Sequence, residues 1–328
     1  MLVVVAALSL PFLFVILFRP LLRRIAWRNA RRRPREALLV VMGSMLGTAI
    51  MTGSFVVGDT LDASIRAQAP RQLGPIDEVV SAVGLDNGAE LRDRLADFES
   101  KDVDGTLPIT VVPAAAATVG EDRRAEPQAQ LLEVDFAAAR RFGDDPDATG
   151  IEGPTPAAGQ AVIGEDVADE LDMGAGAEIE VFAYGQSLRL TVDRVLAQKG
   201  VAGFWFGPET RSPNVFVAPG TIAELAAAAP AGNAAEPPVV GVAVSNVGGI
   251  EAGAVRSDAV VGELEALIEG LPANVTPLKQ DLLDAADESG ASLTELYTSM
   301  GMFAVAAGIL LLVNIFVMLA EERKSELG

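Results

Sequence analysis

Three long apolar runs interrupt a chain in which hydrophobic and polar residues otherwise alternate over short distances. The runs cover residues 1–18, 37–58 and 298–320, and none of them contains Asp, Glu, Lys or Arg. A helix needs about 20 apolar residues to cross the ~30 Å hydrocarbon core of a bilayer. The runs therefore predict three transmembrane helices, over residues 1–18, 36–58 and 298–320. Pro11 lies inside the first run, which leaves open whether that run is a true span.

A dense basic segment separates the first two runs. Residues 19–35 contain eight arginines, in a chain whose formal net charge is -20. Apolar residues such as Leu22 and Ile25 follow one side of a helix, while arginines such as Arg28 follow the other side. The segment predicts an amphipathic helix at the membrane surface that ends near Pro34. A nucleic-acid site is the alternative, but the apolar runs on both sides favour a membrane anchor.

The same arginines predict the orientation of the runs. A secretory signal peptide carries its positive charges before the apolar run, whereas here they follow it. The positive-inside rule places the basic segment in the cytoplasm. Residues 59–297 are then expected outside the cell and residues 321–328 in the cytoplasm, so the chain is expected to be a multi-pass protein of the plasma membrane with a large extracytoplasmic domain.

The external region alternates short strand and helix patterns, which predicts an α+β domain. Two segments rich in Pro and Gly, residues 143–160 and 230–238, divide it. A helix that begins after Pro277 runs directly into the third span, and we expect it to couple movement of the outer domain to movement of the membrane helices. Strands are expected over residues 77–84, 107–119, 128–136 and 239–245, and two further strands are expected on either side of a turn at 184–187. Helices are expected over residues 87–99, 165–173 and 259–270, and the first of them is expected to begin at Asn87.

Composition narrows the chemistry. The chain has no Cys and no His, which excludes disulfides, cysteine or histidine metal ligands and catalytic triads built on histidine. It contains no phosphate-binding glycine loop and no nucleophile-elbow motif. The external region holds 41 acidic and 15 basic residues, but this abundance singles out no catalytic pair of carboxylates. We interpret the charge as a solvated surface that repels nucleic acid, rather than as a surface for ligand capture.

Small and polar residues inside the predicted spans are candidates for helix contacts. Gly43 and Gly47, followed by Ala49 and Gly53, repeat a spacing that lets helix backbones approach closely in lipid. The spacing fits packing within the chain as well as an interface with a second copy. Asn314 is the one amide in the third run, and we expect it to hydrogen-bond a neighbouring helix, with a place in a transport path as the alternative.

Two external motifs resemble binding sites but favour structural roles. The segment DPDATG, residues 145–150, begins like a calcium loop, yet Pro156 stands where the loop needs a bidentate Glu, which favours a turn. The segment GFWFGPE, residues 203–209, gathers three aromatic residues between glycines. We favour packing within the domain over a partner-binding role for them. The sequence therefore predicts no catalytic residue, no metal site and no cofactor site.

Taken together, several segments resemble the FtsX/MacB-type permeases of ABC transporters, and in particular their actinobacterial branch. IAWRNARRRPREALLVVMGSMLGTAIMTGSFVVGDTL is similar to the family's first helix and conserved span. EERKSELG, residues 321–328, resembles the family motif ER-x-x-E-[IL]-G that follows its second span. Between them, in the family's order, stand AVIGEDVADELDMGAGAEIEVF, NVFVAPGTIAEL and VTPLKQDLLDAADESGASLTELYTSMGMF.

This resemblance implies a fold. It implies a MacB-like extracytoplasmic core with an α+β lobe made of residues 59–140 and 236–297, and a β-rich lobe, residues 141–235, inserted between them. Two departures stand against the family pattern. The family's Gly-Asp pair is Ala177-Glu178 here, and the chain stops at Gly328, where the family's coupling helix and two further spans begin. The chain is therefore expected to be the N-terminal half of such a permease, either as a fragment of a longer chain or as a naturally shortened half.

The resemblance also implies a function. A separate ABC ATPase subunit binds and hydrolyses ATP, and the permease transmits that motion to the external domain for export, extraction or activation of an envelope protein. The chain itself is then no enzyme, and its expected partners are the ATPase, a second permease copy or half, membrane lipids, and an envelope protein or lipid-like substrate, with no nucleic acid. The alternative is a membrane-anchored sensor or scaffold that binds an envelope protein through its acidic domain.

The resemblance assigns roles to two groups of residues. Arg28, Arg31 and Arg32 belong to the cytoplasmic helix that leads into the second span. The approach to the ATPase contact is made by Glu322, Arg323, Glu326, Leu327 and Gly328.

Overall fold

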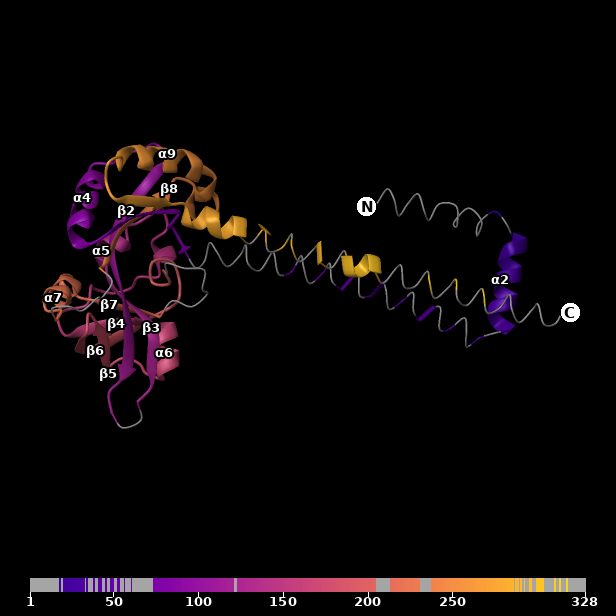
Figure 1. Cartoon of the computed structure of the whole chain (residues 1–328), viewed down its shortest axis with the longest axis horizontal. Coiled ribbons are helices and arrows are strands. Elements are labelled where there is room, and N and C mark those ends of the chain that lie inside the picture. The colour runs from indigo at the N-terminus through magenta and orange to yellow at the C-terminus, as the bar shows by residue number, and fades with distance from the viewer. Residues whose placement is uncertain are drawn as a thin grey trace. The chain divides into compact units, whose positions relative to one another are not determined.

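The computed structural model of the chain describes residues 73–120, 123–204, 213–230 and 237–285, together with one N-terminal helix and scattered positions between residues 18 and 60 and between residues 287 and 317. The chain divides into two compact units. Met1–Asp62 and Ser289–Gly328 form the first unit, and Ala63–Glu288 forms the second. The second unit carries the β-sheet (Figure 1).

Nine strands of the described residues join in one sheet. Their spatial order is β3-β7-β4-β6-β5-β2-β8-β1-β9, and a further pairing joins β3 to β2. Because β3 and β2 are separated by four strands in that order, this pairing closes part of the sheet on itself. The strands are β1 (Glu78–Val83), β2 (Val103–Thr118), β3 (Ala125–Glu133), β4 (Gln160–Gly164), β5 (Glu178–Ala183), β6 (Gln186–Leu196), β7 (Asn214–Val217), β8 (Val239–Asn246) and β9 (Ala273–Thr276).

The long strand β2 belongs to two parts of the sheet. Along its second half Ala117 pairs with Ala125 of β3 on one side and with Glu180 of β5 on the other. This double pairing closes a ring of six strands, β2, β3, β7, β4, β6 and β5, which is a small β-barrel. Along the first half of β2, Leu107 pairs with Ala243 of β8. β8, β1 and β9 continue from there as an antiparallel sheet.

Helices α4 (Leu85–Ala96) and α9 (Ser257–Leu267) cover one face of the antiparallel sheet (Figure 1). Leu91 of α4 and Leu264 of α9 are fully buried in a cluster with Val80 of β1 and Val244 of β8. Side chains alternate between the faces of a strand, and Ala243 of β8 accordingly faces a different cluster. The strands near the centre of the sheet are therefore buried on both faces.

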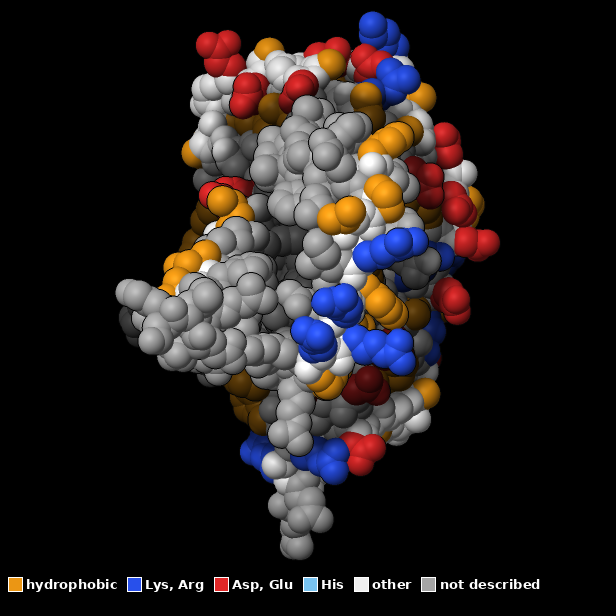
Figure 2. All heavy atoms as spheres, turned by 90° about the vertical axis from the view of Figure 1, so that its right-hand side faces the viewer, with side chains coloured by type: hydrophobic (Ala, Val, Ile, Leu, Met, Phe, Trp, Pro, Cys, Tyr) orange, Lys and Arg blue, Asp and Glu red, His pale blue; other side chains and the backbone are white. Residues whose placement is uncertain are grey.

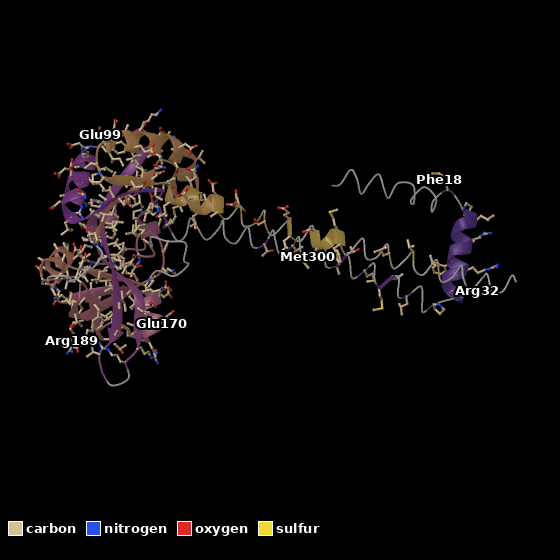
Figure 3. The ribbon with its side chains drawn as sticks, viewed as in Figure 1. Phe18, Arg32, Glu99, Glu170, Arg189 and Met300 are labelled. Atoms are coloured by element: carbon tan, nitrogen blue, oxygen red, sulfur yellow. The ribbon has the colours of Figure 1, made fainter. Side chains whose placement is uncertain are left out.

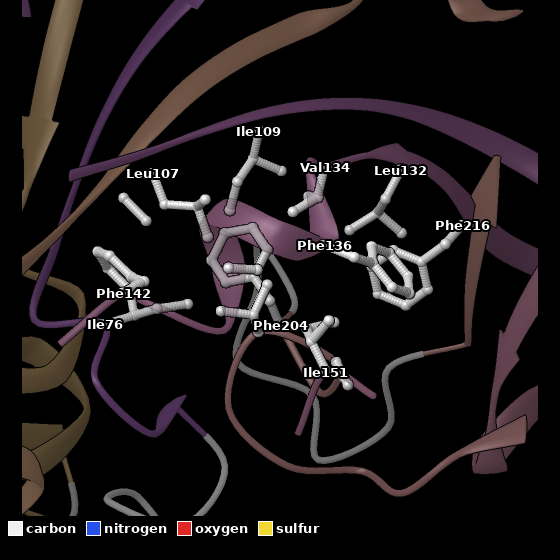
Figure 4. Close-up of a cluster of buried hydrophobic side chains, with 14 of the residues drawn as sticks. Ile76, Leu107, Ile109, Leu132, Val134, Phe136, Phe142, Ile151, Phe204 and Phe216 are labelled. Carbon is white, nitrogen blue, oxygen red and sulfur yellow. The ribbon is translucent and has the colours of Figure 1, made fainter. Parts of the chain in front are cut away.

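A second apolar cluster fills the ring, since all six of its strands contribute to it. Short helices α6 (Glu165–Leu171) and α7 (Thr221–Ala227) add Leu171 and Ile222. A third cluster lies between the ring of strands and the antiparallel sheet. In this cluster the aromatic side chains of Phe136 and Phe216 pack edge to face, with their centroids 5.5 Å apart (Figure 4). The remaining short helices are α5 (Phe136–Ala139), η1 (Pro146–Thr149), α8 (Gly249–Ala252) and η2 (Gly253–Arg256).

The predicted mixture of strands and helices is confirmed for the part of the chain that the structure describes. The prediction that Asn87 opens the first helix is wrong. α4 begins at Leu85 after Gly84, whose φ of 92° favours glycine, and the Asn87 side chain instead donates back to the Val83 carbonyl at 2.8 Å.

The ring draws its strands from both sides of the predicted lobe boundary. β4 to β7 come from the segment predicted as an insertion, residues 141–235, whereas β2 and β3 precede it. The ring of strands is thus larger than the inserted segment alone. The division into lobes 59–140 with 236–297 and 141–235 stays a prediction about domain boundaries.

The first unit includes helix α2 (Pro20–Arg32), within the segment predicted as an amphipathic helix. Its end at Arg32 and the preceding Phe18 are both solvent-exposed (Figure 3). Among the residues that the structure describes, no helix combines the length and the apolar character that crossing a membrane requires. Most of residues 1–18, 36–58 and 298–320, the three predicted spans, lie outside those residues.

Candidate functional site

The two ends of the second unit meet at a buried ion pair. Asp77 lies directly before β1, and Lys279 lies in the first turn of the helix that begins at Leu278. The Lys279 Nζ atom is 2.8 Å from Asp77 Oδ1, and the two side chains are 1% and 0% exposed. The main chains are joined as well, because the Lys279 N–H donates to the Asp77 carbonyl at 3.0 Å. We call this contact the junction.

Lys279 satisfies its whole ammonium group inside the junction. Besides Asp77, its Nζ donates to the carbonyl of Gly74 at 2.8 Å and to the carbonyl of Ile250 at 3.3 Å. An ammonium group has three N–H donors, and three acceptors surround this one. The Lys279 side chain therefore ties the segment before β1 to α8 and to the C-terminal helix.

Asp77 is held from its other side by β8. Its Oδ2 accepts the main-chain N–H of Asn246 at 2.8 Å, and its own N–H donates to the Val244 carbonyl at 2.9 Å. Burial raises the pKa of Asp77, while the Lys279 ammonium and the Asn246 N–H lower it. A Cβ atom on Gly253 would stand 2.5 Å from Asp77 Oδ2, so the close approach of η2 to this carboxylate requires glycine.

A second buried carboxyl lies beside the ion pair. Glu78 is 0% exposed, and its Oε1 accepts from Asn246 Nδ2 at 2.8 Å. The same Nδ2 also donates to the Gly253 carbonyl at 3.2 Å. The pKa of Glu78 is raised to about 7, and burial is the largest cause. The hydroxyl of Ser257 and the amide of Asn246 act to lower this pKa, whereas the charge of Asp77 acts to raise it.

Apolar packing holds the same helix against the domain. Leu278 and Leu282 lie one turn apart and pack against the cluster that joins the ring to the sheet. That cluster includes Ile76, one residue before Asp77, together with Leu107 and Phe142 (Figure 4). The polar junction and the apolar cluster are therefore neighbours along both chain segments.

The junction is built to hold rather than to react. Asp77, Glu78 and Lys279 are closed off from solvent, so no substrate reaches them in this conformation. Breaking a buried pair by removing one partner typically destabilises a protein by about 3–5 kcal/mol, because a buried charge is left without compensation. The segment that enters the domain and the helix that leaves it are thus linked so that displacing one strains the other.

Open grooves occur elsewhere on the second unit. One of them, with a volume of about 640 Å³, is lined by Pro113 and Phe182 among others. Tyr184 also lines it and has a left-handed backbone with φ of 53°. Tyr184 and Gly185 form the two-residue turn between β5 and β6, where both central residues need positive φ. The turn accounts for this backbone conformation.

The two external motifs have structural roles where they are described. Asp145 caps the 3-10 turn of DPDATG by accepting from the Asp147 N–H, and Gly150 ends it with φ of 68°. No group of three or more acidic residues in the described ranges is arranged to hold a metal ion. Phe204 of GFWFGPE is fully buried, whereas residues 205–212 lie outside the described ranges.

On the face that Figure 2 shows, acidic side chains are spaced apart rather than gathered in one patch. Figure 2 shows them at separate places along the top and the right-hand edge of one face, with hydrophobic side chains between them. Glu99 and Glu170 are both exposed and come from different ends of the second unit (Figure 3). This distribution agrees with a solvated surface.

The residues singled out from the sequence lie apart from the junction in the chain. Arg28, Arg31 and Arg32 are exposed residues of α2. Gly53 is helical, and a Cβ there would meet no atom within 4 Å, so its packing role stays a prediction. Outside the described residues lie Gly43, Gly47, Asn314, Glu322, Arg323, Glu326, Leu327 and Gly328.

Sequence reasoning missed the residues of the junction. Lys279 is one of only four lysines in the chain, and it stands in the helix that was expected to couple the domain to the third run. That combination was the available signal. Its partner Asp77 carries no comparable signal, because it is one of many acidic residues and only the fold brings it to Lys279.

Comparisons with known proteins give weak similarity to solved structures alone. No protein-family model and no curated protein matches the chain. Among solved structures, the chain is similar to one described as "a domain of a putative Permease protein" from Porphyromonas gingivalis. The two are 13% identical, the match covers 62% of this chain and 90% of the other, and the TM-score is 0.32. A similarity at this level assigns no activity.

Proposed function

We propose that the chain is a permease subunit of an ABC transporter of the FtsX/MacB type, located in the plasma membrane, which passes ATP-driven motion of a separate ATPase subunit to its external domain. The observation that carries the proposal is the junction. It ties together the two segments through which the second unit continues into the first, Asp77 on one side and Lys279 on the other. A force applied along either segment acts on both.

The first unit supplies the features that the membrane part of this proposal needs. Its described apolar side chains are largely exposed, for example Met45 at 67% and Phe303 at 78%. Large exposed apolar surfaces are uncommon where a protein faces water, and lipid contact accounts for them. The arginines of α2 supply the positive charge that the positive-inside rule associates with the cytoplasm.

In this proposal the chain itself catalyses no reaction. ATP binding and hydrolysis belong to the partner, consistent with the absence of a phosphate-binding loop from the sequence. Glu322, Arg323 and Glu326 are the proposed approach to the ATPase, with Arg28 and Arg31 beneath the same membrane face. A second permease copy or half completes the assembly, and an envelope protein or lipid-like molecule is the object that the external domain acts on.

The proposal is tested by copurification. The full chain, and a version extended beyond Gly328 along its own reading frame, are expressed with the ATPase encoded nearest to it and purified in detergent. We expect the ATPase to copurify and its hydrolysis rate to change on association. If no ATPase associates even with the extended chain, the transporter proposal fails.

The alternative, a sensor or scaffold that binds an envelope protein, predicts a different result. External cross-linking would then capture a specific partner, and that contact would persist when ATP hydrolysis is blocked. Because the chain has no Cys, one cysteine introduced at the exposed Glu265 of α9 gives a single external attachment point for the cross-linker. A partner held equally with and without hydrolysis would favour the scaffold.

A further inference from the structure

Glu78 is a buried carboxyl with no cation of its own. Its side chain is 0% exposed, and its hydrogen bond comes from the neutral Asn246 amide at 2.8 Å. The cation of the junction, Lys279, directs its Nζ to Asp77 Oδ1, Gly74 O and Ile250 O. The ammonium charge is therefore paired with Asp77 rather than with Glu78. If Glu78 were ionised, its charge would be buried beside that of Asp77 without compensation.

The charged groups around Glu78 come from three elements. Asp77 precedes it on the same segment, Lys279 lies on the C-terminal helix, and Asp104 of β2 adds a further negative charge next to Asp77. β8 and α9 contribute the neutral groups of Asn246 and Ser257. With Asp77 and Lys279 balancing each other, the surroundings favour a neutral Glu78.

Around Glu78, the buried acceptor atoms outnumber the hydrogen-bond donors that are available to them. Glu78 Oε2, Asn246 Oδ1 and Ser257 Oγ are buried, and none has a partner in hydrogen-bond geometry among the described residues. Each of the three atoms accepts hydrogen bonds, and the Ser257 hydroxyl brings a single donor. A proton on the Glu78 carboxyl supplies a second donor within the same group. Buried polar atoms are almost always paired, and a proton on Glu78 lets one more of these atoms find a partner.

From this arrangement we propose that Glu78 is carried as the neutral acid in the closed junction and releases its proton when the junction opens, so that opening is coupled to proton release. Glu78 is then a positioning residue, because its carboxyl holds the side chain of Asn246, whose main-chain N–H holds Asp77. A role of this proton release in transport rests on the proposed function. The coupling itself can be tested without ATP and without an ATPase.

The pKa of Glu78 supports this coupling and gives its direction. Burial raises that pKa from 4.5 to about 7 in the closed state, and exposure to water on opening returns it to its ordinary value. Between these two values the open state has lost the proton and the closed state keeps it. Raising the pH across that window therefore favours opening, and the effect levels off above pH about 7.

Hydrogen exchange of the full chain in detergent measures the opening directly. Peptides covering residues 73–82 and 277–285 are followed at about pH 5.5 and about pH 7.5, with rates corrected for the chemical dependence of exchange on pH. From the two pKa values, Glu78 alone raises the opening equilibrium by about twentyfold over this interval. In Glu78→Gln, which cannot lose a proton, the rise is expected to be smaller by that factor.

Glu265→Gln is the matched control, because Glu265 is an exposed carboxylate of α9. It is expected to keep the wild-type rise. The proposal is overturned if Glu78→Gln retains the full rise, or if wild-type exchange of these peptides is the same at both pH values. Failure of either kind leaves the copurification test of the proposed function unaffected.

A measurement on the wild-type chain covers the case in which Glu78→Gln does not fold. At about pH 6 exposed carboxylates are ionised, so a protonated carboxyl band in the infrared spectrum reports buried acids alone. We expect such a band in the native protein, titrating near pH 7 and absent after unfolding in urea. A native spectrum without this band would contradict a neutral Glu78.

Discussion

Asp77 and Lys279 are joined twice, through their side chains at 2.8 Å and through the Lys279 N–H to the Asp77 carbonyl at 3.0 Å. The two residues stand near opposite ends of the sequence of the second unit. A main-chain hydrogen bond alone can break when a helix tilts, and an ion pair alone can separate when water solvates the two charges. The two together fix both the position and the direction of the helix that begins at Leu278.

Removing the cation is expected to destabilise the second unit strongly. In Lys279→Met the Asp77 carboxylate loses its ion pair, and we expect a loss of about 3–5 kcal/mol in the free energy of unfolding, as is typical when a buried charge loses its partner. Pulse proteolysis of the full chain in detergent at increasing urea measures this. Lys101→Met is the control, because the Lys101 side chain is 87% exposed and its Nζ stands as far as 3.9 Å from Asp102 Oδ2. An exposed ion pair of this kind contributes little, so the variant should change the free energy of unfolding by less than about 1 kcal/mol.

Removing both charges is expected to recover part of that loss. Asp77→Asn combined with Lys279→Met removes both charges of the ion pair, and the Asn side-chain oxygen can still accept from the Asn246 N–H. The double variant should therefore be more stable than Lys279→Met alone. If the double variant is no more stable than the single one, the ion pair is not what makes Lys279 important.

The close approach of η2 to Asp77 predicts that Gly253 tolerates no side chain. In Gly253→Ala the new Cβ would stand 2.5 to 2.8 Å from three atoms of the Asp77 carboxylate, which Lys279 and Asn246 hold in place. We expect a loss of about 1–3 kcal/mol in the free energy of unfolding.

Gly262→Ala is the matched control for this substitution. Gly262 lies in α9, where a Cβ would meet no atom within 4 Å. Alanine is the better helix former by about 1 kcal/mol, so this variant should be neutral or slightly more stable. Equal effects at both positions in the urea titration would rule out the close contact as the cause.

The buried acids make the stability of the second unit dependent on pH. Burial raises the pKa of Glu78 from 4.5 to about 7, so its stabilising share is complete below pH about 4.5 and is lost as the pH rises to about 7. The total loss from Glu78 is about 3 kcal/mol. Burial also raises the pKa of Asp77 and of Asp104, which adds to the same direction. Urea titrations at several pH values should show stability falling with pH, and falling less in Glu78→Gln.

Charge reversal on α2 tests the cytoplasmic part of the proposed function. Arg28→Glu with Arg31→Glu changes two exposed side chains of that helix. We expect membrane insertion to persist, because other arginines remain in the basic segment, while the effect of the chain on ATP hydrolysis by its partner falls severalfold. Fractionation and ATPase assays separate the two outcomes. A chain that loses insertion and coupling together would indicate a role in topology alone.

Local signals were sufficient for most of the elements of the second unit. The short apolar run of β8 predicts a strand buried on both faces. The Tyr184-Gly185 turn between β5 and β6 predicts a hairpin through a turn conformation that involves only two residues. Asn87 shows the limit of such reasoning. It is a good capping residue, yet the helix begins earlier, at Leu85, because Gly84 adopts a backbone conformation that favours glycine. The start of the helix therefore depends on the conformation at the end of β1.

Pairing between distant segments was decided by the tertiary structure. β2 has no feature in its sequence that says its first half pairs with β8 and its second half with β3 and β5. The junction has the same origin, because Asp77, Glu78 and Lys279 become a site only when β1, β8 and the C-terminal helix exclude water from them. The sequence by itself determined the apolar runs, the charge, the excluded chemistries and the local elements. Burial and long-range contact depend on the whole fold, so the ion pair, the proton at Glu78 and the ring of strands required the three-dimensional arrangement.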